Sequence, residues 1–492
     1  MTVEAVNVDG NAIGMSAGTG QYVISNEGGM ITIDGANVYD NRTENVDASL
    51  INNVSGTMTV KGNATLNHPN TKTINAKGGE VIIESATIIS DNYAIYAKGG
   101  TTNITGNVTI KASAADKTAG TLTIDGGAIT KAENVDLPAP SGSTWTKIGN
   151  TEVLVKDSSA AVVNGVGYAT LAAAINAAGN DDTVTLLKDV TENVTIPADK
   201  TITLDLNGKT LTNVDDHTIL NNGNLTITGT GKVDNISHAK GALYNKGTVI
   251  VNGGTFDRTK ENGKTSNDSG SNSWYTIKNV GTMTIDDGAT VQTAGNNAAL
   301  GKFSSLVSNG YFDANDYNTN KGLDQPILTI DGGTFRGGLN TIKNDDRAKL
   351  TINGGTFSNY YQAVVQNHNI AEITGGTFTA ASDANAETYG IYNCGCGAEI
   401  DLGTLTVSGG TFTGATYAVA EVSSQNAIVN ISGGQFAGTK AAIIKSSTSN
   451  ATIAVSGGTF SSDPSIHVVG NGNTNIVKRD GSEGAVPSLR RG

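Results

Sequence analysis

Four residues capable of acid–base chemistry lie close together in the repeating pattern of this chain. Asp345, Asp346 and Arg347 follow Asn344, and His368 follows Asn367 one repeat later. Paired carboxylates beside a histidine and an arginine are typical of general acid–base catalysis on a polysaccharide. The alternative is a solvated charged turn with an incidental histidine. Because no acidic or basic column continues onto the following repeats, we expect the charged turn, with no catalytic residue.

A second group of polar residues has the spacing of a calcium-binding loop. Asp316, Asn318, Asn320 and Asp324 place oxygen atoms at positions 1, 3, 5 and 9 of a loop. The glycine, Gly322, is displaced by one position, and no glutamate occupies position 12. Ordinary turn chemistry explains such a loop equally well. The sequence therefore predicts no cofactor, with calcium as the alternative.

This loop belongs to a long insertion between repeats, residues 301–325, which is rich in aromatic side chains. Tyr311, Phe312 and Tyr317 lie in it, although aromatic residues make up only 5% of the chain. Sugar rings and protein partners both favour aromatic contacts. We expect a ligand-contact surface here, and the alternative is that these rings pack the loop onto the rest of the fold.

The two cysteines are close neighbours in the sequence. Cys394 and Cys396 flank Gly395, and no second Cys or His pair stands nearby in the sequence to complete a zinc site. We expect a local disulfide or two free thiols rather than a metal site.

All of these candidate residues lie in or beside a repeated sequence motif, which determines where they lie in the fold. Gly-Gly-Thr/Gln-Phe recurs at intervals mostly in the low twenties of residues, which indicates a solenoid built from one coil per repeat. Before each Gly-Gly pair, an apolar–Thr–apolar triplet predicts a half-buried strand. The first glycines of the phrase are Gly253, Gly332, Gly354, Gly375, Gly409, Gly433 and Gly457.

An asparagine column accompanies the repeat. One asparagine precedes each strand, and stacked amides can hydrogen-bond from coil to coil, which predicts a buried structural ladder rather than a ligand site. The column consists of Asn221, Asn245, Asn279, Asn344, Asn367 and Asn393, with Asn26 and Asn53 as its continuation in the first part of the chain.

One helix interrupts an otherwise all-β pattern. Residues 170–178 place apolar side chains on one face, with Thr170 as the N-cap and Gly179 after the end. We expect this helix to cap a second solenoid domain, residues 159–479, after a first, shorter domain of residues 1–158 that lacks such a cap. The first domain ends in a hairpin around residues 145–155, and residues 480–492 are expected to be a flexible tail.

Charge and hydropathy exclude several classes of protein. The net charge of −13 argues against nucleic-acid binding and against docking on anionic lipid. No apolar run is long enough to insert into a membrane, and the first residues do not read as a signal peptide. We therefore expect an extracellular or cell-surface chain, as a fragment or mature form.

Residues 168–211 closely resemble the opening of right-handed parallel β-helix domains of the pectate-lyase-like type. The segment 457–465 is similar to the end of such domains, which occur in surface and secreted proteins of Gram-positive, often gut-dwelling, bacteria. The resemblance covers residues 160–480 well and 1–158 more loosely. It implies the fold, but it does not decide the function, since enzymes and adhesins share it.

We expect a non-catalytic adhesin or stalk that presents loops to a host or cell-surface glycan or protein. The first alternative is a polysaccharide lyase or glycoside hydrolase. The second is a structural subunit that self-associates end to end through its uncapped coil, because exposed strand edges can pair with another chain.

Overall fold

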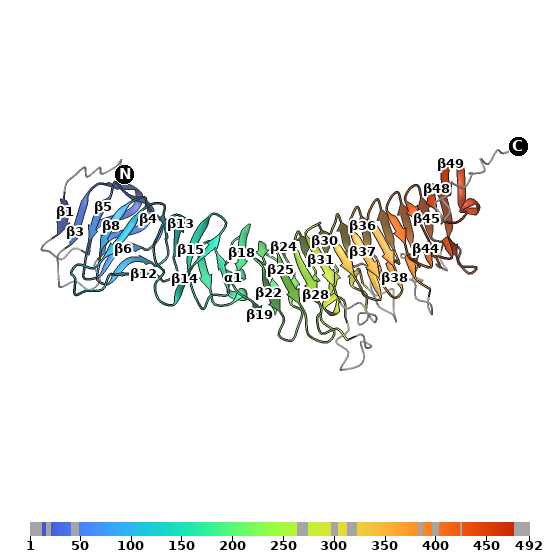
Figure 1. Ribbon diagram of the computed structural model, residues 1–492, viewed down its shortest axis with the longest axis horizontal. Coiled ribbons are helices and arrows are strands. Elements are labelled where there is room, and N and C mark those ends of the chain that lie inside the picture. Colours follow the sequence, from blue (N-terminus) through green and yellow to red (C-terminus); the bar gives the residue numbers. More distant parts are fainter. Residues whose placement is uncertain are drawn as a thin grey trace. The chain divides into compact units, whose positions relative to one another are not determined.

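The computed structural model describes residues 12–15, 21–40, 49–262, 274–296, 304–311, 322–381, 387–395, 403–423 and 426–476. The described chain is almost wholly β, as expected, and forms parallel β-solenoids (Figure 1). It divides into two compact units, Met1–Ala174 and Ile175–Gly492.

Unit 1 is a solenoid of short coils. Strands β2 (Tyr22–Asp34) and β4 (Ser49–Lys61) are long enough to contribute to two columns each, and β4 pairs with β6 through its first half and with β7 through its second. The three columns run through β1 (Ala12–Met15), β3 (Asn37–Asp40), β5 (Ala64–Asn67), β8 (Ala86–Ile89) and β11 (Val108–Lys111); through β6 (Lys72–Ala76), β9 (Tyr93–Ala97) and β12 (Thr121–Ile124); and through β7 (Glu80–Ile83), β10 (Thr101–Ile104) and β13 (Ala128–Ala132).

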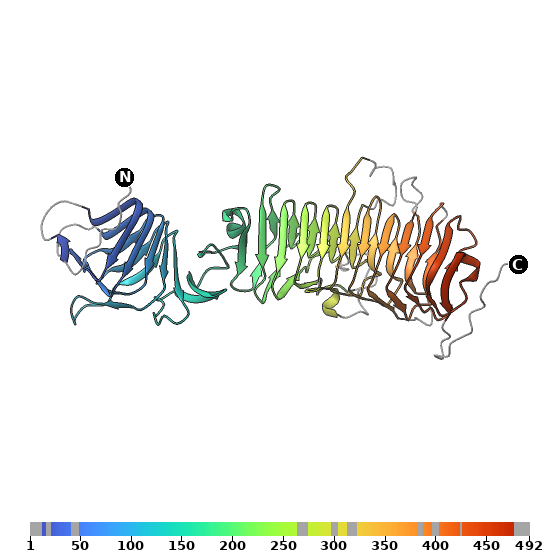
Figure 2. The ribbon, with the colours of Figure 1, turned by 90° about the horizontal axis from the view of Figure 1, so that it is seen from above.

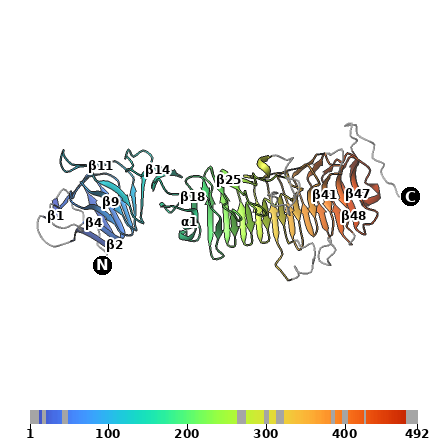
Figure 3. The same cartoon turned by 90° about the horizontal axis from the view of Figure 1, so that it is seen from below.

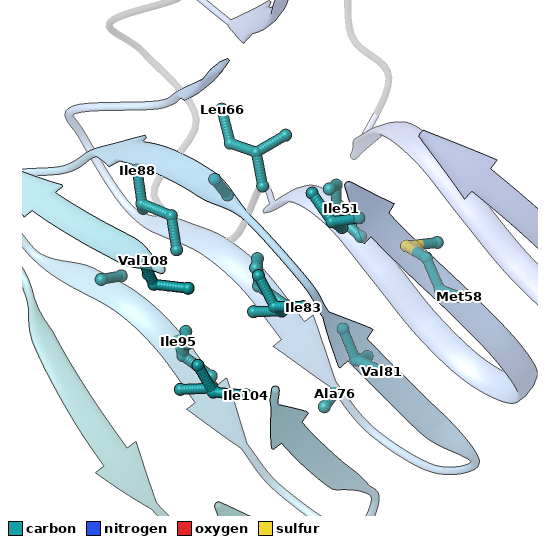
Figure 4. Close-up of a cluster of buried hydrophobic side chains, with 14 of the residues drawn as sticks. Ile51, Met58, Leu66, Ala76, Val81, Ile83, Ile88, Ile95, Ile104 and Val108 are labelled. Carbon is teal, nitrogen blue, oxygen red and sulfur yellow. The ribbon is translucent and has the colours of Figure 1, made fainter. Parts of the chain in front are cut away.

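The core of unit 1 consists of aliphatic side chains from adjacent coils, because residues in register stack on one another. Met58 packs in register with Val81, and Ile83 lies in register with Ile104 (Figure 4). The expected hairpin forms from β14 (Ser143–Ile148) and β15 (Thr151–Lys156), and β15 pairs antiparallel with β13. At the end of this unit, β12 pairs with β9, and β13 follows β10.

A second hairpin follows, and then the one α-helix that the described residues contain. The hairpin consists of β16 (Ala161–Val163) and β17 (Val166–Tyr168). Helix α1 spans Leu171–Ala177, and Thr170 Oγ1 accepts a hydrogen bond from the Ala173 amide at 3.1 Å, which confirms the predicted N-cap. Lys200 donates to the Asn176 carbonyl at 3.0 Å at the other end of α1. A cation at this position is favourable because carbonyls at a helix C-terminus lack partners.

Unit 2 is built from three parallel columns of strands, whose coils are seen as successive rungs in Figures 2 and 3. The column that matters most here is named the asparagine sheet. It contains β20 (Val194–Ile196), β23 (Ile219–Asn221), β26 (Leu243–Asn245), β29 (Ile277–Asn279), β32 (Val307–Asn309), β35 (Asn340–Asn344), β38 (Ala363–Asn367), β41 (Tyr389–Asn393), β44 (Tyr417–Glu421) and β47 (Ala441–Lys445).

The other two columns carry the apolar–Thr–apolar strands and the Thr-Phe strands of the repeat. The first runs through β18 (Asp182–Leu186), β21 (Thr201–Asp205), β24 (Asn224–Thr228), β27 (Thr248–Val251), β30 (Thr282–Ile285), β33 (Ile327–Ile330), β36 (Lys349–Ile352), β39 (Ile370–Ile373), β42 (Thr404–Val407), β45 (Ile428–Ile431) and β48 (Thr452–Phe460). The second runs through β19 (Val190–Thr191), β22 (Lys209–Thr212), β25 (Gly231–Asp234), β28 (Gly254–Asp257), β31 (Ala289–Gln292), β34 (Thr334–Arg336), β37 (Thr356–Asn359), β40 (Thr377–Ala380), β43 (Thr411–Thr413) and β46 (Gln435–Phe436), and it ends on β48. Two 3₁₀ turns (Ala294–Asn296 and Ser465–His467) and β49 (Val468–Ile476) complete the described elements.

The Gly-Gly-Thr-Phe phrase has a clear structural role. Its second glycine has a positive φ, for example 100° at Gly355 and 101° at Gly376, where a side chain would be strained. The phenylalanine then points into the core. Six of them form a continuous stack along the solenoid, with ring centroids 4.4–5.1 Å apart: Phe335, Phe357, Phe378, Phe412, Phe436 and Phe460.

Candidate functional site

The asparagine ladder is the internal support of the candidate site. Each ladder asparagine is fully buried and donates its amide to the oxygen of the next, and Asn344 donates to Asn367 at 2.8 Å. The same amide also donates to a backbone carbonyl, in this case Ile370 at 2.9 Å. The ladder in unit 2 runs through Asn221, Asn245, Asn279, Asn309, Asn344, Asn367 and Asn393 and ends on Glu421.

The ladder is confirmed, with one addition. Asn309 also belongs to it, although the sequence pattern does not single it out. In unit 1, Asn26 donates to Asn53 at 2.9 Å, which confirms the predicted continuation.

The residue before each ladder asparagine faces the opposite side of the sheet, because side chains alternate along a strand. These residues form an outer column in strict register, about 4.8 Å apart from coil to coil. In chain order the column is Leu220, Tyr244, Lys278, Ser308, Lys343, Gln366 and Tyr392. Its middle, from Lys278 to Gln366, is polar and cationic, and a tyrosine lies on either side of this stretch.

The middle of this column forms a buried charge cluster with Asp345. Lys343 Nζ lies 2.7 Å from Asp345 Oδ1, and Ser308 donates to Asp345 Oδ2 at 2.9 Å. Lys278 donates to Ser308 at 2.8 Å and to the Gly310 carbonyl at 2.7 Å. Burial lowers the pKa of Lys278 to about 8, although the nearby Asp345 acts in the opposite direction. The cluster is a charge-paired structural network.

The expectation that Asp345 and Asp346 lie on a solvated turn is wrong. Both side chains are fully buried. Tyr311 forms two backbone hydrogen bonds with Asp346 and so runs antiparallel beside it. Arg347 then turns the chain with a φ of 60°. A carboxylate that is charge-paired and has no solvent exposure has no room for a substrate, which argues against acid–base catalysis here.

His368 does lie close to Asp345, as the shared ladder predicts, but its main partner is a cysteine. His368 Nε2 is 3.7 Å from Cys394 Sγ, and the two residues directly follow Asn367 and Asn393 on adjacent coils. Burial lowers the pKa of His368 to about 4 and raises the pKa of Cys394 to about 12. The ring and the thiol are therefore both neutral at pH 7.

Beyond this pair lies a group of three tyrosines, the half-buried Tyr389 and Tyr392 and the buried Tyr417, which we name the tyrosine patch. The rings of Tyr389 and Tyr417 are nearly parallel, at 14°, with centroids 6.2 Å apart. The ring centroid of Tyr392 lies 4.9 Å from that of Tyr389. Tyr389 and Tyr392 are each half-buried, so that part of each ring faces solvent.

A carboxylate is fixed beside the tyrosine patch. Glu387 accepts hydrogen bonds from the hydroxyls of Tyr389 and Tyr417, each at 3.3 Å, and forms an ion pair with Lys440 at 2.9 Å. The hydrogen bonds and charge of Lys440 lower the pKa of Glu387. Desolvation and the charge of Glu387 raise the pKa of Tyr389 to about 12. Glu387 therefore stays an acceptor and the Tyr389 hydroxyl stays a protonated donor at neutral pH.

The opposite end of the outer column carries another aromatic cluster. The ring centroid of His217 lies 5.0 Å from that of Tyr244 and 4.9 Å from that of Trp274. Its Nδ1 accepts a hydrogen bond from the Gly241 amide at 2.9 Å, and burial lowers the pKa of His217 to about 4. Beneath this cluster, the buried Arg258 pairs with Glu261 at 2.5 Å. These contacts hold loops against the solenoid.

The structure places the remaining predicted contact residues as follows. Tyr311 packs against the coil, with its hydroxyl 3.5 Å from the Val280 carbonyl. Phe312, Tyr317, Asp316, Asn318, Asn320 and Cys396 lie outside the described residues, and of the four candidate calcium ligands only Asp324 lies within them. In the described part of the chain, no group of three or more His, Cys, Asp or Glu side chains is arranged to hold a metal ion.

Sequence reasoning did not identify the tyrosine patch or the His368–Cys394 pair. The signal for both is register: once Asn367 and Asn393 are aligned, the residues at equal offsets on adjacent coils become neighbours. Tyr389 and Tyr417 meet in this way, at the first positions of β41 and β44.

Comparison of the chain with family models, with curated proteins and with solved structures finds no match. Among the described residues, no helix is long and apolar enough to cross a membrane.

Proposed function

We propose that this chain is a glycan-binding stalk of a secreted or cell-surface protein, and that it binds its ligand without cleaving it. In this proposal the fold is the right-handed form of the parallel β-helix, because parallel crossover connections are right-handed in nearly all proteins. The bacterial surface is the proposed location, in line with the resemblance of residues 168–211.

The observation that carries the proposal is the tyrosine patch with Glu387. Partly exposed aromatic rings offer an apolar face to the C–H side of a sugar ring, while phenol hydroxyls and a carboxylate offer hydrogen bonds to sugar hydroxyls. Tyr389 and Tyr392 supply the partly exposed rings, and Glu387, which accepts from the hydroxyls of Tyr389 and the buried Tyr417, supplies the carboxylate. Both exposed rings lie on β41, which is paired on both sides in the sheet, so little ordering is needed on binding.

The charges around the patch favour a neutral glycan. Lys440 neutralises Glu387, and the whole chain carries a net charge of −13. A polyanionic ligand would meet repulsion from such a protein at low ionic strength.

The test compares the patch with a matched tyrosine–carboxylate pair elsewhere. Tyr389→Ala and Tyr392→Ala should each weaken binding to the glycan selected on an array about tenfold or more, equivalent to about 1.4 kcal/mol. The control is Tyr96→Ala in unit 1, where Tyr96 donates to Asp125 at 2.5 Å on the surface. Equal binding by all variants, or equal loss in the control, would refute the proposed site.

Cleavage of a polysaccharide at Asp345 and His368 is the second candidate function. A glycosidase needs two carboxyl groups on either side of an accessible bond, and Asp345 and Asp346 are adjacent and fully buried. The burial of these acids favours the binding function.

A further inference from the structure

We propose that Tyr244 and Trp274 form a second contact site for the same glycan, so that one polysaccharide chain spans this site and the tyrosine patch. We name the pair the tryptophan site. The inference rests on the proposed glycan-binding function and deepens it, because it makes the ligand a polymer rather than a short oligosaccharide. It begins from the outer column, on which Tyr244 and Tyr392 both lie.

The two rings of the tryptophan site are partly exposed and are held in place by the fold. Tyr244 and Trp274 are each half-buried, and their ring centroids lie 6.3 Å apart at an angle of 70°. The ring of His217 packs against both. One edge of the indole lies against the backbone at Gly241, where an added Cβ would come within 2.9 Å of Trp274 Cζ3. The rings are therefore positioned before a ligand arrives, which lowers the entropic cost of binding.

The polar groups beside these rings match those of the tyrosine patch. Asp216 forms an ion pair with Lys240 at 2.7 Å, just as the carboxylate of the tyrosine patch is paired with a lysine. The hydrogen bond from Lys240 lowers the pKa of Asp216, so this carboxylate stays an acceptor at neutral pH. The exposed Lys246 places its Nζ 5.0 Å from the centroid of the Tyr244 ring. Aromatic faces beside a neutralised carboxylate and ammonium donors suit the C–H faces and hydroxyls of a sugar.

The two sites lie on the same face of the asparagine sheet at a defined spacing. Five coil-to-coil steps along the outer column separate Tyr244 from Tyr392, which gives ~24 Å at about 4.8 Å per step. Lys343 and Gln366 lie between them on the column, and each is partly exposed. These polar side chains offer hydrogen bonds to sugar hydroxyls along the path. A polysaccharide therefore reaches both sites, whereas a disaccharide reaches only one.

The test compares the polymer selected on the array with its own disaccharide fragment, by isothermal titration calorimetry on the full chain. Contact at two sites raises affinity through effective concentration. The polymer should therefore bind at least about a hundredfold more tightly than the fragment. Two fragments should bind per chain, one at each site.

Variants then separate the two sites. Trp274→Ala and Tyr244→Ala should each weaken polymer binding at least about tenfold, because they reduce a two-site contact to one. Each should also lower the fragment stoichiometry from two to one. Trp145→Phe is the matched control and should change neither value, since Trp145 also has a lysine over its ring but lies in unit 1.

The control variant also provides a direct signal from the site. The chain has two tryptophans, so in the Trp145→Phe background all tryptophan emission comes from Trp274. Addition of the fragment should change this emission, and the change should persist when Tyr389→Ala is added. Circular dichroism of each variant shows that it is folded.

The outcomes distinguish a failure of this site from a failure of the tyrosine patch. Polymer binding that Tyr389→Ala weakens and Trp274→Ala leaves unchanged would overturn the second site and leave the tyrosine patch in place. Trp274 emission that a saturating amount of fragment does not alter would overturn it equally. Polymer binding that Trp274→Ala weakens and Tyr389→Ala leaves unchanged would refute the tyrosine patch, and with it the claim that one polysaccharide spans both sites.

Discussion

The Asn393 amide donates to the Glu421 carboxylate at 2.5 Å, and this contact ends the asparagine ladder of unit 2. Glu421 is fully buried and accepts a second hydrogen bond from the Ser423 amide at 2.6 Å. Burial raises the pKa of Glu421, although these hydrogen bonds act against the shift. A structural ladder of neutral amides therefore ends on a titratable group.

This arrangement predicts a pH-dependent contribution to stability. A carboxyl group whose pKa is raised by folding stabilises the folded state most when protonated, so its contribution is full below the unfolded-state pKa and is lost as the pH rises through the folded-state value. The melting temperature of the wild-type chain, relative to that of Glu421→Gln, should therefore rise as the pH falls from 7 to about 4.5. A difference that is constant across this range would show that folding does not raise the pKa of Glu421.

The ladder itself predicts a loss of stability on truncation. Asn344→Ala or Asn367→Ala removes the hydrogen bonds that the amide donates to the next asparagine and to backbone carbonyls, and the one that it accepts from the preceding asparagine. The neighbouring groups are left unpaired, at a cost of about 1–3 kcal/mol each. Asn224→Ala, at an exposed position, should change stability by less than about 0.5 kcal/mol. Urea unfolding measures both. Equal midpoints for Asn367→Ala and Asn224→Ala would contradict the buried ladder.

The phenylalanine stack predicts a larger effect. Phe378 is fully buried between Phe357 and Phe412, at centroid distances of 4.7 and 4.4 Å. Phe378→Ala should destabilise the protein by about 3–5 kcal/mol through lost burial and the cavity that remains. Phe378→Leu should cost less, because it retains most of the volume. Similar unfolding free energies for the two variants would mean that the coil collapses around the site.

His217 predicts a pH effect of opposite sign to that of Glu421. Burial lowers its pKa to about 4 from an ordinary value of 6.5. A histidine with a lowered pKa loses its stabilising contribution as the pH falls from about 6.5 through the folded-state value. NMR of the imidazole should show no titration of His217 between pH 7 and 5, and His217→Gln should flatten the acid side of the stability profile. A His217 titration midpoint near 6.5 would contradict its burial.

The architecture could be predicted from the sequence, whereas most of the site could not. Gly-Gly-Thr-Phe and the ladder asparagines repeat along the chain, so each repeat independently predicts the same coil. Thr170 marks the start of the helix. Asn309 escapes detection because the strand that follows it begins only at Ile327, after the long insertion.

The errors and omissions share one physical cause, which is contact between coils. From the sequence, Asp345 is expected at the surface. In the fold, Lys343 neutralises the charge of its carboxylate and Ser308 donates a hydrogen bond to it. His368 and Cys394 become neighbours only when the register of β38 and β41 is known. A repeat pattern gives the period of the solenoid, but the side chains that meet depend on insertions between the repeats.

The measurement that tests the central claim most directly is binding and turnover on the same glycan panel. The protein is applied to an array, each bound glycan is then incubated with it in solution, and reducing ends and unsaturated products are measured. We predict binding with no release of product, and binding that Asp345→Asn does not change while Tyr389→Ala weakens it. Depolymerisation of any bound glycan, lost on changing Asp345 or His368, would contradict the account and make the chain an enzyme.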